Sequence, residues 1–351
     1  MKLLANKAPA KARLLPLLEA IARGRSDFSL SDFAGAQIDW IIRSGLGPAC
    51  FHAAKELSAN RASPHWPALA AAELTARCIA EEQRDAMAEI LDAARAAVPR
   101  LILLKGISVA QEFYPQFHWR PMRDIDLLAP PQSLAPLEGV LRALGYRQHS
   151  AAPPSAYVRH HHTMPFFHPQ RRLWVEAHHH LISSKNRAAA DPVFALAHVL
   201  AQARASAFDG RPVYRLAPEL ELVYLAAHWA QDLKEVGGMI AALDAIFLLR
   251  RSGARLDWEK LLGWLRDSAA APALYLLLSY LHSRALIALP EGVLRRMALS
   301  RRGFGRWPLA AAHRIIDRCL LDGAGCGAGL SRRALHAAWN TLTLPRPPRL
   351  H

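Results

Sequence analysis

The sequence predicts an α+β protein in which a small mixed β-sheet lies between two helical regions. Apolar residues recur at helical spacing over residues 14–98, and helical spacing returns after Leu181 and continues almost to the end of the chain. Between these regions, short apolar runs bounded by Gly, Pro and charged residues are typical of buried strands. We therefore expect an N-terminal helical region at residues 1–98, a core at 99–185 and a C-terminal helical region at 186–351.

The predicted elements have recognisable boundaries. Residues 68–97 are rich in Ala, Leu and Glu, which favour a long helix. Lys105-Gly106 ends the first strand, two prolines close the second, and Gly145 stands where a glycine commonly follows a helix. The predicted elements are, in order, a helix at 68–97, a strand at 101–104, a helix at 107–113, a strand at 124–128, a helix at 133–144, a strand at 146–149, and a hairpin of strands at 163–168 and 173–178.

The composition limits the class of protein. The chain has 351 residues, of which 52% are hydrophobic, and this is ample for a sizeable buried core. The net charge of +15 favours anionic partners such as nucleic acid or phosphate-bearing substrates. Only eight of the 44 basic residues are Lys, however, and the basic residues are spread along the whole sequence. This spread indicates a compositional bias more than a binding patch.

The sequence favours a cytoplasmic protein without a membrane span. Its four cysteines form neither a C-x-x-C pair nor a dense disulfide framework, which fits a reducing compartment. Lys7, Lys11 and Arg13 interrupt the apolar residues near the N-terminus, so no secretion signal is expected. The most apolar stretch, residues 271–289, contains Arg284 and fits a buried helix better than a membrane span. The cysteines are Cys50, Cys78, Cys319 and Cys326.

Three carboxylates on predicted strands are the candidate catalytic residues. Asp124 and Asp126 are separated by one residue, so their side chains project from the same face of a strand. Two adjacent ionised carboxylates repel each other unless a cation lies between them, and Mg²⁺ prefers such oxygen ligands. Glu176 is a polar residue in an apolar run, and it completes a triad if its strand neighbours the first. The alternatives are a solvated strand end for the two aspartates and an exposed edge strand for Glu176.

Three carboxylates suit two-metal phosphoryl transfer. One metal ion would neutralise a triphosphate, while the other would lower the pKa of the attacking hydroxyl. The sequence also resembles a known family over several segments. These are Leu103-Leu104-Lys105-Gly106, Tyr114-Pro115, Arg120-Pro121-Met122-Arg123-Asp124-Ile125-Asp126-Leu127-Leu128, Leu144-Gly145-Tyr146 and Val175-Glu176-Ala177-His178. In order and spacing they resemble the uncharacterised nucleotidyltransferase family of the polymerase β superfamily.

The resemblance is strongest over residues 101–181 and continues more weakly through 216–219, His228, 243–246 and 256–258. It implies a mixed sheet with helices and a nucleoside triphosphate donor, with ATP the expected one, bound through Mg²⁺ or Mn²⁺. It also implies that the metal is held by the carboxylates Asp124, Asp126 and Glu176. The core at 99–185 would then be the nucleotidyltransferase core.

The resemblance assigns further residues to nucleotide binding. Where the wider superfamily has Gly-Ser, this chain has Lys105-Gly106, so Gly106 would allow close backbone approach to the triphosphate and Lys105 would supply a positive charge. The alternative for Lys105 is a solvated turn. Arg120 and Arg123 precede the metal-binding strand and would bind phosphate oxygens or pair with the acids, and Arg120 is the better match to the family pattern.

The histidines offer a further hypothesis. His178 shares the face of Glu176 and would orient that carboxylate or the acceptor, or would be an ordinary buried strand histidine. A zinc site is disfavoured, because alternate histidines of a hairpin point to opposite faces and no cysteine accompanies them. His228 and the aspartate at 244 are interpreted as packing residues. The histidine runs are 160–162, 168 and 178–180.

The function expected from the sequence is transfer of a nucleoside monophosphate from a nucleoside triphosphate to an acceptor, with release of pyrophosphate. The acceptor (a small molecule, sugar, peptide or RNA) and the oligomeric state are not determined by the sequence. The alternative is a catalytically inactive nucleotide-sensing or nucleic-acid-binding module on the same fold, which the net charge of +15 would suit. The glycine-rich residues 323–329 follow no strand, so they are interpreted as a connector, and the proline-rich residues 345–351 as a frayed end.

Overall fold

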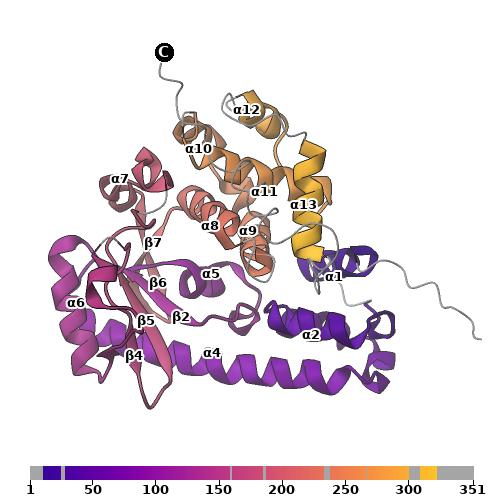
Figure 1. The fold of residues 1–351 in the computed structure, drawn as a ribbon, viewed down its shortest axis with the longest axis horizontal. Coiled ribbons are helices and arrows are strands. Elements are labelled where there is room, and N and C mark those ends of the chain that lie inside the picture. Colours follow the sequence, from indigo (N-terminus) through magenta and orange to yellow (C-terminus); the bar gives the residue numbers. More distant parts are fainter. Residues whose placement is uncertain are drawn as a thin grey trace, which may run out of the picture.

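The computed structural model describes residues 11–24, 28–158, 160–184, 187–232, 238–266, 268–299 and 309–321. The glycine-rich residues 323–329, the proline-rich end at 345–351 and Cys326 lie outside the described residues. Within the described part, a mixed sheet is combined with helices that precede it, flank it and follow it, as Figure 1 shows. The α+β fold class is therefore confirmed.

Seven described strands form one sheet in the order β3-β4-β5-β2-β1-β7-β6. β2 and β5 are parallel, as are β1 and β7, and the other neighbouring pairs are antiparallel. The parallel pair β2/β5 is central to the site, because it sets two polar strand faces side by side. The strands are β1 (Ile102–Leu103), β2 (Asp124–Leu128), β3 (Arg147–Gln148), β4 (Phe166–His168), β5 (Leu173–His178), β6 (Ala203–Phe208) and β7 (Arg211–Leu216).

One face of the sheet packs on two helices. Helix α4 (Trp66–Ala94) runs beneath the sheet and continues beyond it under α2 (Gly35–Arg43), and α6 (Pro131–Ala143) lies beside it (Figure 1). The alternate apolar residues of β2 and β5 point to this face and are fully buried with side chains of the two helices. They are Ile125, Leu127, Val175 and Ala177. This packing fixes which side chains of β2 and β5 face the opposite layer.

The opposite layer consists of α5 (Lys105–Phe113), α8 (Pro218–Asp232) and α9 (Met239–Ser252). Leu104 and Leu128 join these helices in the larger hydrophobic core. The N-terminal helix α1 (Lys11–Arg23) contacts α9 and α13 (Leu309–Leu321), so the two helical regions pack together. The remaining α-helices are α3 (Gly47–Ala54), α7 (Leu196–Ala201), α10 (Trp258–Trp264), α11 (Ala271–Ser283) and α12 (Val293–Leu299).

Helix α11 is buried along most of its length, as expected for the apolar stretch at 271–289. None of the described helices combines the length and the apolar character needed to cross a membrane. Cys50 is a buried free thiol and Cys78 an exposed one.

The expectation of continuous helical structure after Leu181 is wrong at β6 and β7. These strands form a hairpin through Asp209-Gly210, whose φ angles of 46° and 80° are those of a tight hairpin turn. Tyr214 N donates to Leu101 O at 2.9 Å, so the hairpin extends the sheet past the expected boundary at residue 185. Small residues such as Ala and Val fit both helical and strand spacing, and the Asp-Gly pair was the distinguishing feature.

Candidate active site

The parallel pairing of β2 and β5 brings the predicted acidic residues together. Asp126 lies opposite Glu176 in the register, and Leu128 lies opposite His178. The apolar residues that alternate with them along both strands pack on α4 and α6. Asp126, Glu176 and His178 therefore all project toward α5 and α8. The strand of Glu176 is thus the neighbour that the triad requires.

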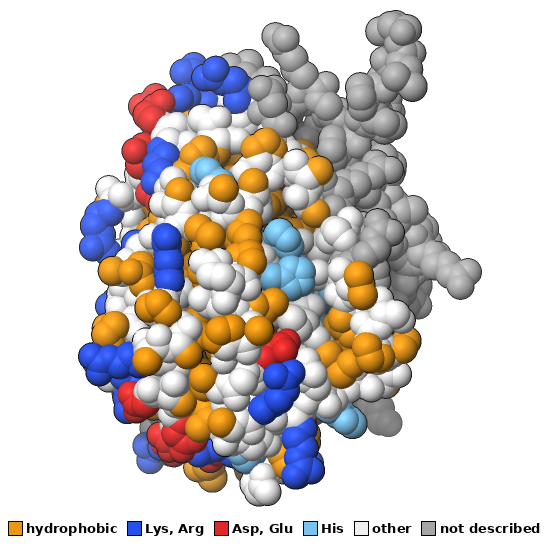
Figure 2. Space-filling view, turned by 90° about the vertical axis from the view of Figure 1, so that its left-hand side faces the viewer, with side chains coloured by type: hydrophobic (Ala, Val, Ile, Leu, Met, Phe, Trp, Pro, Cys, Tyr) orange, Lys and Arg blue, Asp and Glu red, His pale blue; other side chains and the backbone are white. Residues whose placement is uncertain are grey.

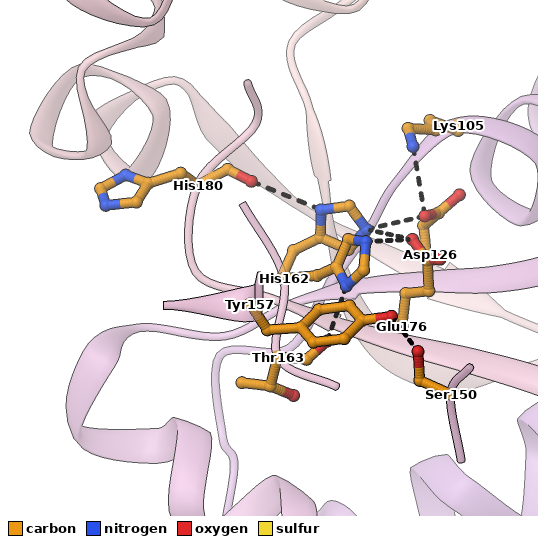
Figure 3. A network of polar contacts seen from close by, with 9 residues as sticks. Lys105, Asp126, Ser150, Tyr157, His162, Thr163, Glu176 and His180 are labelled. Carbon is orange, nitrogen blue, oxygen red and sulfur yellow. Dashed lines mark hydrogen bonds and ion pairs between the residues drawn. The ribbon is translucent and has the colours of Figure 1, made fainter. Parts of the chain in front are cut away.

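The side chains of Asp126, Glu176, His178 and Lys105 form a compact polar cluster (Figure 3). Nε2 of His178 lies 2.7 Å from Oδ1 of Asp126 and 3.4 Å from Oε2 of Glu176. Nζ of Lys105 donates to the same Oδ1 of Asp126 at 3.3 Å. Asp126 is 3% exposed and His178 fully buried, so these charges interact in a medium that screens them weakly.

The electrostatics of the cluster follow from burial and pairing. Burial opposes ionisation of Asp126, but the Lys105 ammonium and the hydrogen bond from His178 outweigh it and hold the pKa of this carboxyl below its usual range. Asp124 shows the opposite result. Burial, together with the negative charges of Asp126 and Glu176, raises the pKa of Asp124 to about 7.

Asp124 stands apart from the tight group. The donor atoms of Asp126, Glu176 and His178 all lie within 4.8 Å of one another, and Asp124 is not among them. It is the first residue of β2, is only partly buried, and lines a cleft outside the cluster. The structure therefore brings two of the three predicted carboxylates together and places the third at the cleft end of the same strand.

His162 also contacts the cluster, at Glu176, and sequence reasoning did not predict this contact. Its Nδ1 lies 2.6 Å from the carbonyl oxygen of Thr163, so this nitrogen carries the proton, and its Nε2 lies 3.3 Å from Oε2 of Glu176. Burial lowers the pKa of His162, which favours the neutral ring. In that form Nε2 presents a lone pair to a carboxylate oxygen.

The histidine run 160–162 departs from the expected geometry. The hairpin strand was expected to begin at residue 163, but β4 begins at Phe166, and the run joins the sheet only through an isolated bridge between His162 and His178. Because the run is not a regular strand, its residues need not alternate between faces. Donor atoms of His160, His161 and His162 consequently lie within 4.8 Å of one another.

Lys105 begins helix α5 in a strained conformation. Its φ is 44°, a left-handed value that costs free energy for a residue with a side chain. Leu104 N donates to Asp126 O at 3.1 Å, which fixes the preceding residue against β2. The turn thereby aims the Lys105 side chain at the carboxylates. Although burial opposes its charge, Asp126 raises the pKa of Lys105 above its usual range.

Packing inside the protein leaves no space for a side chain at Gly106. A Cβ at this position would lie 2.6 Å from Cγ and 2.7 Å from Sδ of Met122, and 3.3 Å from a guanidinium nitrogen of Arg120. The glycine thus allows α5 to pack closely on the segment that leads into β2. Close approach of a phosphate to Gly106 stays a prediction.

Arg120 and Arg123 have different surroundings. Nε and a terminal nitrogen of Arg120 donate to both carboxylate oxygens of Asp244 on α9, at 2.9–3.2 Å, and Tyr114 Oη donates to Oδ1 of Asp244 at 2.6 Å. Arg120 is therefore held inside the protein by a buried partner. Arg123 is exposed and forms no hydrogen bond or ion pair with a residue in the described part of the chain.

Helix α8 presents two buried polar atoms next to the cluster. The hydroxyl of Tyr224 and Nε2 of His228 are buried and have no hydrogen-bond partner among the described residues. Burial lowers the pKa of His228, and the nearby charge of Lys105 lowers it further. Buried polar groups without partners are uncommon in folded proteins and often indicate a place where a ligand or water binds.

The basic residues form no continuous patch on the face of the molecule that Figure 2 shows. There, Lys and Arg side chains lie among acidic and hydrophobic ones, and histidines gather near the middle of the face. On that face the distribution agrees with a charge spread along the sequence.

Comparison with known proteins identifies the family. No curated protein and no solved structure matches the chain. The model of the family described as uncharacterised nucleotidyltransferase matches residues 34–285, which is more than half of the chain and includes every residue of the cluster. The chain therefore belongs to this uncharacterised nucleotidyltransferase family.

Proposed function

We propose that this nucleotidyltransferase is metal-dependent and moves a nucleoside monophosphate from a nucleoside triphosphate, with ATP the expected donor, to an acceptor with release of pyrophosphate. The observation that carries the proposal is the register of β2 and β5, which sets Asp126 opposite Glu176 with Lys105 3.3 Å from Asp126. A cytoplasmic location belongs to the same proposal, supported by the free thiols of Cys50 and Cys78.

The donor atoms of the cluster fit a divalent metal. Donor atoms of Asp126, Glu176 and His178 converge within 4.8 Å; carboxylate oxygens are the ligands that Mg²⁺ and Mn²⁺ prefer, and an imidazole nitrogen suits Zn²⁺. The neutral ring of His162 directs a lone pair at Glu176 Oε2, and the two lone pairs repel each other. A cation bound by both atoms would remove this repulsion. Asp126 and Glu176 would hold the ion, and Asp124 would join them from the cleft side.

The bound metal would neutralise the triphosphate and activate the acceptor oxygen. In the transfer, the acceptor oxygen forms a bond to the α-phosphorus, and the bond from this phosphorus to the bridging oxygen breaks. Pyrophosphate leaves with the electron pair, and the acceptor proton passes to water. Lys105 would contact the triphosphate, because its ammonium group lies at the start of α5 and beside Asp126.

Calorimetric binding tests the proposal. Each of the four triphosphates is titrated into the wild type with Mg²⁺ or Mn²⁺, and into Asp126→Asn. We expect metal-dependent binding of at least one triphosphate, weakened at least tenfold in the variant. Asp85→Asn is the matched control, because Asp85 is an exposed residue of α4, and it should bind as the wild type does.

The inactive module predicts a different pattern. It would bind nucleotide or nucleic acid equally well in Asp126→Asn and in the wild type, with no requirement for metal. Absence of triphosphate binding by the wild type would also contradict the proposal. Circular dichroism of each variant separates a lost site from a lost fold.

A further inference from the structure

A cleft of about 680 Å³ reaches the reaction centre at Asp124. It lies between helix α4, the turn from α2 to α3, the segment 120–124 and the start of α9. A cavity of this volume accommodates a small organic ligand. No role follows for it from the metal cluster alone, because Asp126, Glu176 and His178 do not line it.

The long wall of the cleft is apolar. Helix α4 contributes one face whose members recur at helical spacing, and none of them is charged. Ile79 on this face is 45% exposed, although a large aliphatic side chain is normally covered. Ile42, Pro48 and Ile240 line the cleft from other segments. The α4 residues are Ala68, Ala71, Ala72, Thr75, Ala76 and Ile79.

The charged residues of the cleft are almost all cationic. Arg43, Arg120 and Arg123 line it, and Asp124 is the one acid among its lining residues. Arg120 is neutralised by Asp244, but Arg123 has no partner among the described residues and stands beside Asp124. An anionic group on a ligand would therefore find a free guanidinium next to the catalytic strand.

The position of the cleft assigns it to the second substrate. Lys105 and the start of α5, where we propose that the triphosphate binds, do not line it. A ligand in the cleft would meet the reaction centre only at Asp124, from the cleft side. The donor and this ligand would then approach the carboxylates from separate sites.

We propose that the cleft binds the acceptor, and that the acceptor is an anionic amphiphile: an apolar body against α4, a negatively charged group at Arg123, and a nucleophilic oxygen at Asp124. This inference rests on the proposed function. The apolar body accounts for the exposed aliphatic wall, and the anionic group for the unpaired Arg123. The oxygen would attack the α-phosphorus in the bond exchange described above, so that the product keeps the apolar body.

Anilinonaphthalene sulfonate, an apolar aromatic molecule with one sulfonate, is a suitable probe of this class. Its binding is followed by fluorescence for the wild type, Thr75→Trp, Leu74→Trp and Arg123→Gln. Thr75 lines the cleft, so the tryptophan fills it, and we expect at least tenfold weaker binding. Leu74 is 59% exposed on the same helix but does not line the cleft, and its variant should bind as the wild type does. Loss of the Arg123 charge should weaken binding about threefold to tenfold.

Triphosphate binding is measured on the same variants. The proposal requires that Thr75→Trp keeps metal-dependent triphosphate binding and that probe and triphosphate bind simultaneously. Equal probe binding by Thr75→Trp and Leu74→Trp would overturn it. Loss of triphosphate binding in Thr75→Trp, or displacement of the probe by triphosphate, would assign the cleft to the donor and also overturn it. If the wild type binds the probe in the cleft but binds no triphosphate, the proposed function is wrong. The assignment of the cleft to the acceptor is then wrong as well, and the result shows only that the cleft binds a ligand.

Discussion

Asp244→Asn tests whether Arg120 is primarily a structural residue. Asp244 has no exposed surface and accepts hydrogen bonds from the guanidinium of Arg120 and from the hydroxyl of Tyr114. The substitution keeps the shape of the side chain and removes its charge. It leaves the guanidinium of Arg120, whose side chain is 15% exposed, without a counter-ion.

The magnitude follows from the burial of the pair. Removing one partner of a buried ion pair costs about 3–5 kcal/mol, because the remaining charge is left uncompensated. The asparagine oxygen still accepts one hydrogen bond, so we expect a loss near the lower end, about 3 kcal/mol of the free energy of unfolding. Tyr114→Phe removes only one hydrogen bond to a charged group and should cost about 1.5–3 kcal/mol.

Urea unfolding followed by circular dichroism measures these losses. The segment that Arg120 anchors leads directly to Asp124, so triphosphate binding should also weaken in Asp244→Asn although Asp244 is not in the cluster. The reasoning would be refuted if Asp244→Asn lost less than about 1 kcal/mol of the free energy of unfolding while Arg120→Gln kept the stability of the wild type but no longer bound triphosphate. In that case Arg120 would be a phosphate ligand, as the family pattern suggests.

Three further predictions concern buried groups around the site. Burial raises the pKa of Glu221 from 4.5 to about 8, so its contribution to stability is fully present below about pH 4.5 and is lost as pH rises from about 4.5 to about 8. The wild type should lose up to about 1.4 kcal/mol per pH unit over that range in urea unfolding, and Glu221→Gln should flatten the slope. Gly106→Ala should lower stability by about 1–3 kcal/mol through its clash with Met122, and an unchanged melting temperature would contradict this. Tyr224→Phe removes a buried hydroxyl that has no described partner, so thermal unfolding should find it as stable as the wild type or more so; clear destabilisation would mean that the hydroxyl is satisfied in the folded protein.

Local sequence patterns predicted much of the central fold. The bounds of β2 and β5 and the extent of α4 follow from strand alternation, proline boundaries and helix-forming residues, all of which act over a few positions. The β6–β7 hairpin was missed, because its residues suit both periods and its strand character depends on pairing with β1. Propensity does not encode that long-range partner.

The same distinction applies to the site. Asp124, Asp126 and Glu176 were predicted as candidates because carboxylates in apolar strands are unusual within a short window, and the structure brings Asp126 and Glu176 together. His162 was not found, because its contact with Glu176 depends on an irregular segment folding back through one isolated bridge. The link between Arg120 and Asp244 spans 124 residues and is likewise a product of tertiary packing.

The unfavourable features of the molecule converge on one region. Lys105 adopts a left-handed conformation, Asp124 is held with a raised pKa by burial and by its acidic neighbours, and Tyr224 carries a buried hydroxyl without a described partner. Each lowers the stability of the folded chain, and packing alone would favour apolar residues in regular conformations. A divalent cation would relieve the repulsion among the acids, and a triphosphate would give Lys105 a second anionic partner. Ligand binding should therefore stabilise this protein substantially, because the ligands compensate groups that the fold leaves uncompensated.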